Sequence, residues 1–183
     1  MQRWTWVGGT WLLAAIAHRW WARAPEGSLY LALCDGLSHA ALGLVTSLPA
    51  ARYAPRPERV LTGALLGALA IDLDHVAAAR SIRFERCMTM PQRPATHSLA
   101  VAAALTGLVA GWDRYLGIGL GLGLGSHLVR DLVTGGAPLV HPRRVVQLRE
   151  HLAVPLVLGL AAGGSWLMRR LPNEASSRET MLG

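Results

Sequence analysis

The stretch from Tyr115 to Asp131 constrains the fold of this chain more than any other. Its first part alternates glycine with apolar residues, and it ends in His127-Leu-Val-Arg-Asp131. On a helix, His127 and Asp131 share one face, and steps of four residues back from them reach Gly123 and Gly119. A groove of glycines lets another helix come close. A histidine and an aspartate inside a membrane-type segment are costly, and a bound divalent cation is the most economical reason for them.

The composition favours a membrane protein over a soluble domain. Of the 183 residues, 52% are hydrophobic and only 16% are charged, and the mean hydropathy is +0.32. A soluble domain usually has about a quarter of its residues charged. The net charge is +7, and all 18 basic residues are arginines. Because these arginines stand in short runs between apolar segments, we interpret them as contacts with lipid headgroups and exclude nucleic acid as a partner.

The order of apolar and polar segments predicts an all-α fold, a polytopic transmembrane helical bundle of about five to six spans. Proline- and arginine-bearing loops separate the spans. The fourth span opens at Thr96-His-Ser98, with Thr96 as its expected N-cap. The candidate spans are residues 4–21, 28–48, 58–79, 96–112, 115–133 and 152–168.

Three regions follow from this reading. Residues 1–27 form a tryptophan-rich anchor or interfacial helix, with cleavage after Ala15-Ile-Ala17 as the alternative. Residues 28–170 form the membrane-embedded domain, and residues 171–183 form a disordered polar tail. The cysteines Cys34 and Cys87 make no motif and predict no disulfide.

Alternation of the spans brings most of the costly polar residues to one end of the bundle. The third span ends there, the fourth begins there and the fifth ends there, and Asp35 and His39 enter from the same side, about 10 to 16 Å deep. The predicted metal ligands are His39, Asp72, His75, His97, His127 and Asp131.

Several roles stay open at this point. Asp74 points away from Asp72 on a regular helix, so it joins the same centre only if the helix unwinds or a second metal is present. Asp35 either binds the metal, pairs with an arginine or orients His39. The histidines near loop ends are expected to be solvated or to make helix-helix hydrogen bonds; these are His18, His141 and His151.

Four motifs stand in a fixed order along the chain: a histidine in an early apolar helix, Asp72-Leu-Asp-His75, Arg93-x-x-Thr-His-Ser98 and Ser126-His-x-x-x-Asp131-Leu-x-Thr134. Over residues 39–142 this order resembles the YdjM-type family, bacterial inner-membrane proteins described as metal-dependent hydrolases and as LexA-binding. The resemblance implies a multi-pass protein of the inner (cytoplasmic) membrane. The chain departs from the family pattern at two places. It has Gln92-Arg-Pro94 where the family typically has His-Arg-Gly, and its segment after Asp131 is about one residue shorter.

The resemblance and the polar residues together predict a membrane-embedded hydrolase that binds zinc, with manganese as the alternative metal. Asp74 is the expected general base or bridging ligand. Arg93 either holds a substrate phosphate or anchors the chain at the interface. The expected substrate is an amphiphile, with a phosphoester of a lipid or polyprenyl carrier ahead of a carboxylic ester, and membrane lipids are the expected surroundings.

The alternative is a non-catalytic membrane protein whose His/Asp cluster carries a metal or a proton or holds the bundle together. A conduction path needs polar groups at both membrane faces, and here they favour one. The LexA-binding label corresponds to no residue pattern in the chain, and the sequence leaves the oligomeric state open.

Overall fold

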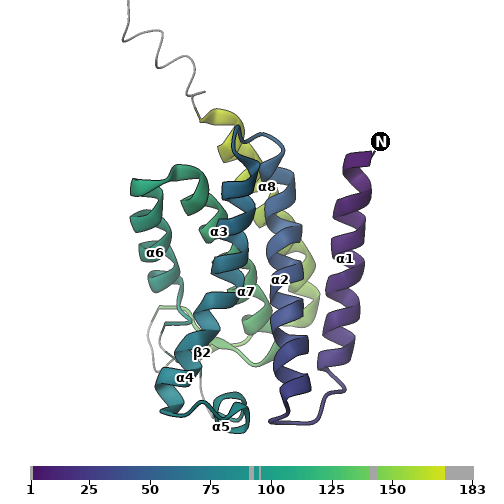
Figure 1. The fold of residues 1–183 in the computed structure, drawn as a ribbon, viewed down its shortest axis with the longest axis vertical. Coiled ribbons are helices and arrows are strands. Elements are labelled where there is room, and N and C mark those ends of the chain that lie inside the picture. Colours follow the sequence, from purple (N-terminus) through teal and green to yellow (C-terminus); the bar gives the residue numbers. More distant parts are fainter. Residues whose placement is uncertain (1, 91–92, 95, 141–143, 172–183) are drawn as a thin grey trace, which may run out of the picture.

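The protein is a bundle of α-helices, seen here in a computed structural model that describes residues 2–90, 93–94, 96–140 and 144–171 (Figure 1). The expected all-α fold is confirmed. Residues 172–183 of the expected tail, Gln92 and His141 lie outside the described residues. The elements are α1 (Gln2–Trp21), α2 (Leu29–Ala51), α3 (Pro57–Leu69), the 3₁₀ turn η1 (Ala70–Asp72), α4 (Leu73–Ala79), α5 (Phe84–Met88), α6 (Leu99–Trp112), α7 (Arg114–Thr134), β1 (Ala137–Pro138), β2 (Val145–Val146), the 3₁₀ turn η2 (Glu150–Leu152) and α8 (Ala153–Arg170).

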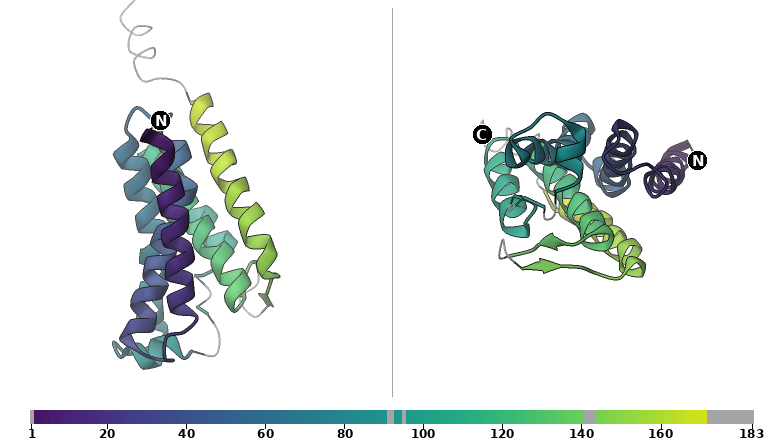
Figure 2. Two further views of the ribbon diagram at one scale, coloured as in Figure 1. Left: turned by 90° about the vertical axis from the view of Figure 1, so that its right-hand side faces the viewer. Right: turned by 90° about the horizontal axis from the view of Figure 1, so that it is seen from below.

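Among the described helices, four stretches are long and apolar enough to cross a membrane: Leu29–Ala51, Pro57–Ala79, Arg114–Thr134 and Glu150–Arg170. The helix α6 is apolar but has 14 residues, fewer than the roughly 20 that a perpendicular span needs. The helix α1 stands beside α2 (Figure 1), and α8 leans away from the other helices (Figure 2). Large apolar side chains point outward, as lipid-facing residues do; Leu108 and Trp112 are 75% and 79% exposed.

The glycine stripes hold α3 against α7. The close-packing groove predicted at Gly119 and Gly123 is thus present, and α3 is the helix that fills it. A Cβ atom added at Gly123 would lie 2.8 Å from the carbonyl carbon of Ala64, and nearer still to its oxygen. Gly63, Gly67 and Gly119 meet backbone atoms of the facing helix in the same way. Since a side chain at these positions would force the backbones apart, the glycines set the distance between the two helices.

Side-chain caps fix where two of these helices begin. The carboxylate of Asp113 accepts hydrogen bonds from the amides of Tyr115 and Leu116, both at 3.0 Å, and so starts α7 directly after α6. The N-cap of α6 is Ser98, whose hydroxyl accepts from Val101 N at 3.3 Å. The prediction of Thr96 as this cap is wrong, because the hydroxyl of Thr96 donates instead to the carboxylate of Asp74.

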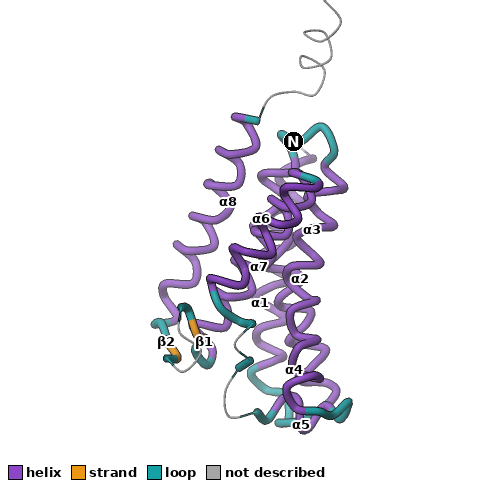
Figure 3. The backbone as a smooth tube through the Cα atoms, turned by 90° about the vertical axis from the view of Figure 1, so that its left-hand side faces the viewer, coloured by secondary structure: helices purple, strands orange, loops and turns teal. Residues whose placement is uncertain are grey.

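After α7 the chain contains two short strands that pair in antiparallel fashion. β1 and β2 pair Ala137 with Val146 and Pro138 with Val145. Figure 3 shows this hairpin at the same end of the bundle as α4 and α5. The segments that follow α3 and α7 therefore share one end, whereas the loop between α2 and α3 lies at the other (Figure 1).

This arrangement predicts the outcome of cysteine labelling in a variant whose Cys34 and Cys87 are replaced by serine. Glu85→Cys and Val145→Cys should react with an impermeant maleimide from one side of the membrane, because both exposed positions lie at the end that holds α5 and the hairpin. Pro55→Cys, in the opposite loop, should react only from the other side. Labelling of positions 85 and 145 from opposite sides would contradict the shared end.

Candidate metal centre

The polar residues of the third span gather because the helix changes form at its end. The regular helix α3 stops at Leu69, the 3₁₀ turn η1 follows over Ala70–Asp72, and α4 continues from Leu73. A 3₁₀ turn is wound more tightly than an α-helix, so it shifts the directions of the side chains that follow. Asp72 and Asp74 thereby both contact His97. The helix does not unwind here, although the sequence reasoning expected Asp74 to require it; it is wound more tightly, and Asp74 reaches His97 in this form.

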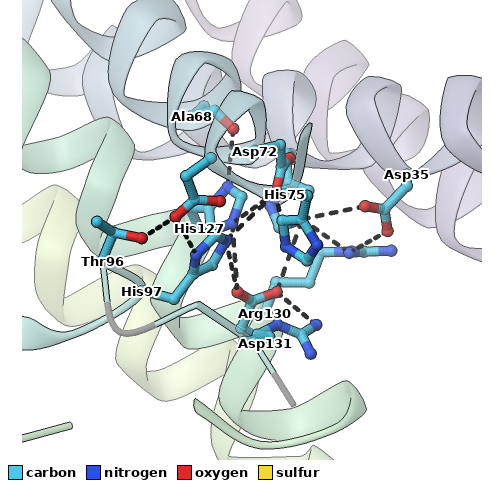
Figure 4. A network of polar contacts seen from close by, with 12 residues as sticks. Asp35, Ala68, Asp72, His75, Thr96, His97, His127, Arg130 and Asp131 are labelled. Carbon is cyan, nitrogen blue, oxygen red and sulfur yellow. Dashed lines mark hydrogen bonds and ion pairs between the residues drawn. The ribbon is translucent and has the colours of Figure 1, made fainter. Parts of the chain in front are cut away.

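Four side chains from three segments face one another at the centre (Figure 4). The Oδ1 atom of Asp72 lies 3.3 Å from Nε2 of His97 and 3.4 Å from Nε2 of His127. The Oδ2 atom of Asp131 lies 3.2 Å from Nε2 of His127 and 3.7 Å from Nε2 of His97. We call these residues, Asp72, His97, His127 and Asp131, the four-residue centre.

A hydrogen bond to the backbone decides which nitrogen of His127 faces the centre. Its Nδ1 lies 2.8 Å from the carbonyl oxygen of Ala68. A carbonyl oxygen only accepts, so Nδ1 carries the hydrogen, and the neutral ring presents a lone pair on Nε2. Histidines that bind metals are commonly oriented by such a bond from the other ring nitrogen.

The buried atoms of the centre fit a divalent cation. Nε2 of His127 and Oδ2 of Asp131 are both buried and have no hydrogen-bond partner among the described residues, although they face each other at 3.2 Å. Two acceptors at this distance repel unless a cation or a proton lies between them. Zinc bonds of about 2.0–2.1 Å in a tetrahedron give ligand-to-ligand distances of about 3.3–3.4 Å. Four of the six ligand pairs in the centre lie 3.2 to 3.7 Å apart, which is close to that spacing.

His75 reaches the edge of the centre in the same manner as His127. Its Nδ1 lies 3.2 Å from the carbonyl oxygen of Cys87, which fixes the hydrogen on Nδ1, and its Nε2 lies 4.0 Å from Asp72. Asp74, His75 and His97 form a second group whose ligand atoms all lie within 4.8 Å of one another.

His39 lies under the centre but is held by an arginine. Its ring stacks on that of His127, with centroids 3.7 Å apart, so it forms the floor that its depth predicts. Its Nε2 lies 2.9 Å from Nη1 of Arg130, and since a guanidinium only donates, the lone pair of His39 accepts this bond. His39 can therefore bind a metal through Nε2 only if Arg130 gives up that contact.

Arg130 is the functional residue that the sequence reasoning missed. It is 3% exposed, and its Nη1 lies 2.6 Å from Oδ1 of Asp35. Asp35 thus pairs with an arginine, which is one of its three expected roles. The sequence does contain a signal for Arg130: a charged arginine in an apolar helix is as costly as the neighbouring Asp131 and likewise needs a partner.

Arg93 holds the other oxygen of Asp131. Its Nη2 donates to Oδ1 of Asp131 at 2.7 Å and its Nη1 to the carbonyl of Gly136 at 3.5 Å. Burial alone would lower the pKa of Arg93, but the bond to Asp131 outweighs it and raises the pKa. Arg93 therefore stays charged and turns Oδ2 of Asp131 toward the centre.

His97 contacts more carboxylates than His127, the other histidine of the four-residue centre; its partners are Asp72, Asp74 and Asp131. Burial lowers its pKa, but hydrogen bonds to Asp72 and Asp74 outweigh that effect and raise the pKa to about 9, so a metal that binds His97 would have to displace the proton from Nε2. Oδ2 of Asp74 accepts from His97 and from the hydroxyl of Thr96, while Oδ1 of Asp74 is buried without a hydrogen-bond partner in the described chain.

Among the described residues of the centre, Asp72 is the most exposed, and we call its side of the centre the opening. The rings of His97 and His127 and the carboxylate of Asp131 are buried, whereas the side chain of Asp72 is 33% exposed. Asp74, His75 and Arg93 surround this opening and are also partly exposed. The structure thus brings all six predicted ligands together, with His39 and His75 at the edges. His18 instead stacks on Trp21, and His151 is exposed in η2.

The family model for the YdjM inner membrane protein matches residues 34–157, more than half of the chain. The chain belongs to this family. All residues of the four-residue centre, with His39, His75 and Arg130, lie inside the matched part, whereas α1 lies outside it. Neither the curated proteins nor the solved structures include a significant match to this YdjM family member.

Proposed function

We propose that this protein is a metal-dependent hydrolase of the inner membrane that acts on an ester or phosphoester of an amphiphilic substrate. The observation that carries the proposal is the pair of buried, unpartnered acceptors at the centre, Nε2 of His127 and Oδ2 of Asp131. A donor set of imidazoles and carboxylates at this close spacing favours zinc, with manganese as the second choice.

The buried side of the centre would hold the metal through His97, His127 and Asp131. Asp72, on the open side, would complete the coordination or share its place with water. A bound zinc ion lowers the pKa of a water molecule and polarises the scissile group. His127 needs its bond to Ala68 for this role, and Asp131 needs its bond to Arg93, because these contacts aim the ligand atoms at the centre.

Asp74 is the proposed general base. Its Oδ2 is fixed by His97 and Thr96, which leaves the buried Oδ1 with an unused lone pair. A carboxylate placed in this way can accept a proton from a water molecule that attacks the substrate. Asp74 also supports His97, so its two contributions must be separated by experiment.

The surroundings of the opening support an amphiphilic substrate. The centre lies at the end of apolar helices, where the headgroup of a lipid would rest if the bundle crosses a membrane. Arg93 stands at the opening as a cation, although its Nη2 is engaged by Asp131. A phosphoester of a lipid or polyprenyl carrier fits this setting better than a soluble peptide.

Hydrolysis should be measured on phospholipids, lysolipids and polyprenyl phosphates by the release of phosphate or headgroup. We expect activity that chelation removes and added zinc or manganese restores. Asp74→Asn should lower kcat by about 100-fold or more, because a general base contributes about 10²–10⁴-fold. Asp74→Asn should lower the metal affinity less, by about tenfold, because Asp74 orients the ligand His97 and does not itself hold the metal.

Glu85→Gln is the matched control for Asp74→Asn, since Glu85 is an exposed carboxylate at the same end of the bundle, and it should behave as wild type. Metal-loaded protein that is inert to the whole panel, with Asp74→Asn indistinguishable from wild type in cells, would instead support the non-catalytic alternative, a metal-binding or transport protein.

A further inference from the structure

A cleft of about 290 Å³ lies between α1, α2, α7 and α8. Most of its wall is apolar and includes Trp11, Leu42, Val129 and Val157. The cleft and the four-residue centre lie on different faces of α7. Val129 and Val133 line the cleft, whereas His127 and Asp131 belong to the centre. The volume is at the small end of the range for small-molecule sites, about 300–1,000 Å³. It suits one hydrocarbon chain better than a whole lipid.

The polar end of the cleft contains a buried cation with unused donors. Arg130 lines the cleft and is 3% exposed, and its Nε and Nη2 have no hydrogen-bond partner among the described residues. Only Nη1 is engaged, with Asp35 and His39. The Nε and Nη2 hydrogens form one edge of the planar guanidinium, which binds two oxygens of a phosphate or carboxylate side by side. Buried donors of this kind call for an acceptor.

The direction of the cleft matches that of a lipid in a membrane. Arg130 is one turn from the end of α7, and His18 and Glu150, which line the same end, lie near the ends of α1 and α8 that adjoin the loops. Trp11 and Val157 lie farther along their helices. An anionic group would therefore rest near the interface and its chain would run inward. Glu150 is exposed and can turn to water, whereas Arg130 cannot.

We propose that this cleft binds one chain of an anionic lipid whose phosphate accepts hydrogen bonds from Nε and Nη2 of Arg130. The ring of Trp21 lies 4.8 Å from Cζ of Arg130 and covers one face of the guanidinium. Trp11, Trp21 and His18 belong to α1, outside the part of the chain that matches the family model. The amino-terminal helix would thus add a lipid site to the family fold. The site needs neither a bound metal nor hydrolysis.

Native mass spectrometry of the full chain in detergent tests the proposal with two single-chain probes, 1-oleoyl lysophosphatidic acid and the uncharged monoolein. We expect the phosphate probe to bind at least about tenfold more tightly than monoolein, and equally well after treatment with a chelator. Arg130→Lys keeps a positive charge beside Asp35 but lacks the two-donor edge, so the preference should fall to about twofold or less.

A second variant tests the apolar wall independently. Ala15→Trp places a large ring in the cleft that Ala15 lines, and it should weaken both probes by about tenfold. Leu12→Trp, on the outer face of the same helix where Leu12 is 63% exposed, is the matched control and should change neither. Equal binding of the two probes by wild type, a preference that survives Arg130→Lys, or binding that is lost on chelation would each overturn the proposal. The last result would place the lipid at the metal centre instead.

Discussion

Replacing His127 with alanine is expected to remove the metal from the purified protein. His127 offers a buried lone pair whose direction is fixed by the bond to Ala68, whereas the lone pair of the neighbouring His39 is engaged by Arg130. Loss of a residue that merely orients a ligand costs about 10–100-fold in metal affinity, so loss of the ligand itself should cost about 100-fold or more. Asp131→Ala should have a similar effect, because it removes the facing oxygen and leaves Arg93 without its partner. Elemental analysis after desalting measures both.

The control for these variants is His151→Ala, which removes an exposed histidine of η2 from the same protein. It should retain the metal content of the wild type. Full retention of metal by both His127→Ala and Asp131→Ala would contradict the assignment of these residues as ligands, whatever the activity of the protein.

Replacing Gly123 with alanine should destabilise the bundle strongly. The new Cβ would lie 2.8 Å from the carbonyl carbon of Ala64 and 2.9 Å from the amide nitrogen of Ala68. Both are backbone atoms of α3, so the helices must move apart. Overpacking of this kind costs about 1–3 kcal/mol, and a backbone clash belongs at the upper end. For a chain of this size about 3 kcal/mol lowers the apparent melting temperature by roughly 6–12 °C.

The matched control is Gly107→Ala in α6, where a Cβ would meet no atom within 4 Å. Its melting temperature should stay within about 2 °C of the wild type. The separation of α3 from α7 should also weaken metal binding by Gly123→Ala, because Asp72 and His127 stand on the two sides of this contact. Equal melting temperatures for Gly123→Ala and Gly107→Ala would contradict the close packing of α3 and α7.

The close-packing faces of these helices could be predicted because the glycine spacing is local in the sequence, whereas the pairing of α3 with α7 could not. The four-residue spacing of Gly63 and Gly67 and that of Gly119 and Gly123 give two faces without side chains, and the structure packs these faces together. The alternation of the spans then places the third, fourth and fifth segments so that their polar ends meet. Both inferences rest on the spacing of residues along the chain and on the order of the spans.

Other details depend on tertiary contacts. Thr96 and Ser98 are both good caps, and the contact of Thr96 with Asp74 decides between them. The 3₁₀ turn at Ala70–Asp72 is invisible in the hydropathy of the segment, yet it allows Asp74 to join Asp72. The pairing of Arg130 with Asp35 requires α2 and α7 to be neighbours, which the order of the spans alone does not state.

The most direct test of the central claim is the metal content of the wild-type protein, purified in detergent without added metal, together with X-ray absorption at the zinc edge. We predict about one zinc ion per chain, bound by nitrogen and oxygen ligands at about 2.0–2.1 Å, with imidazole among them. Protein that is purified without metal, and that binds neither zinc nor manganese when these are supplied, would contradict the assignment of the four-residue centre as a metal site.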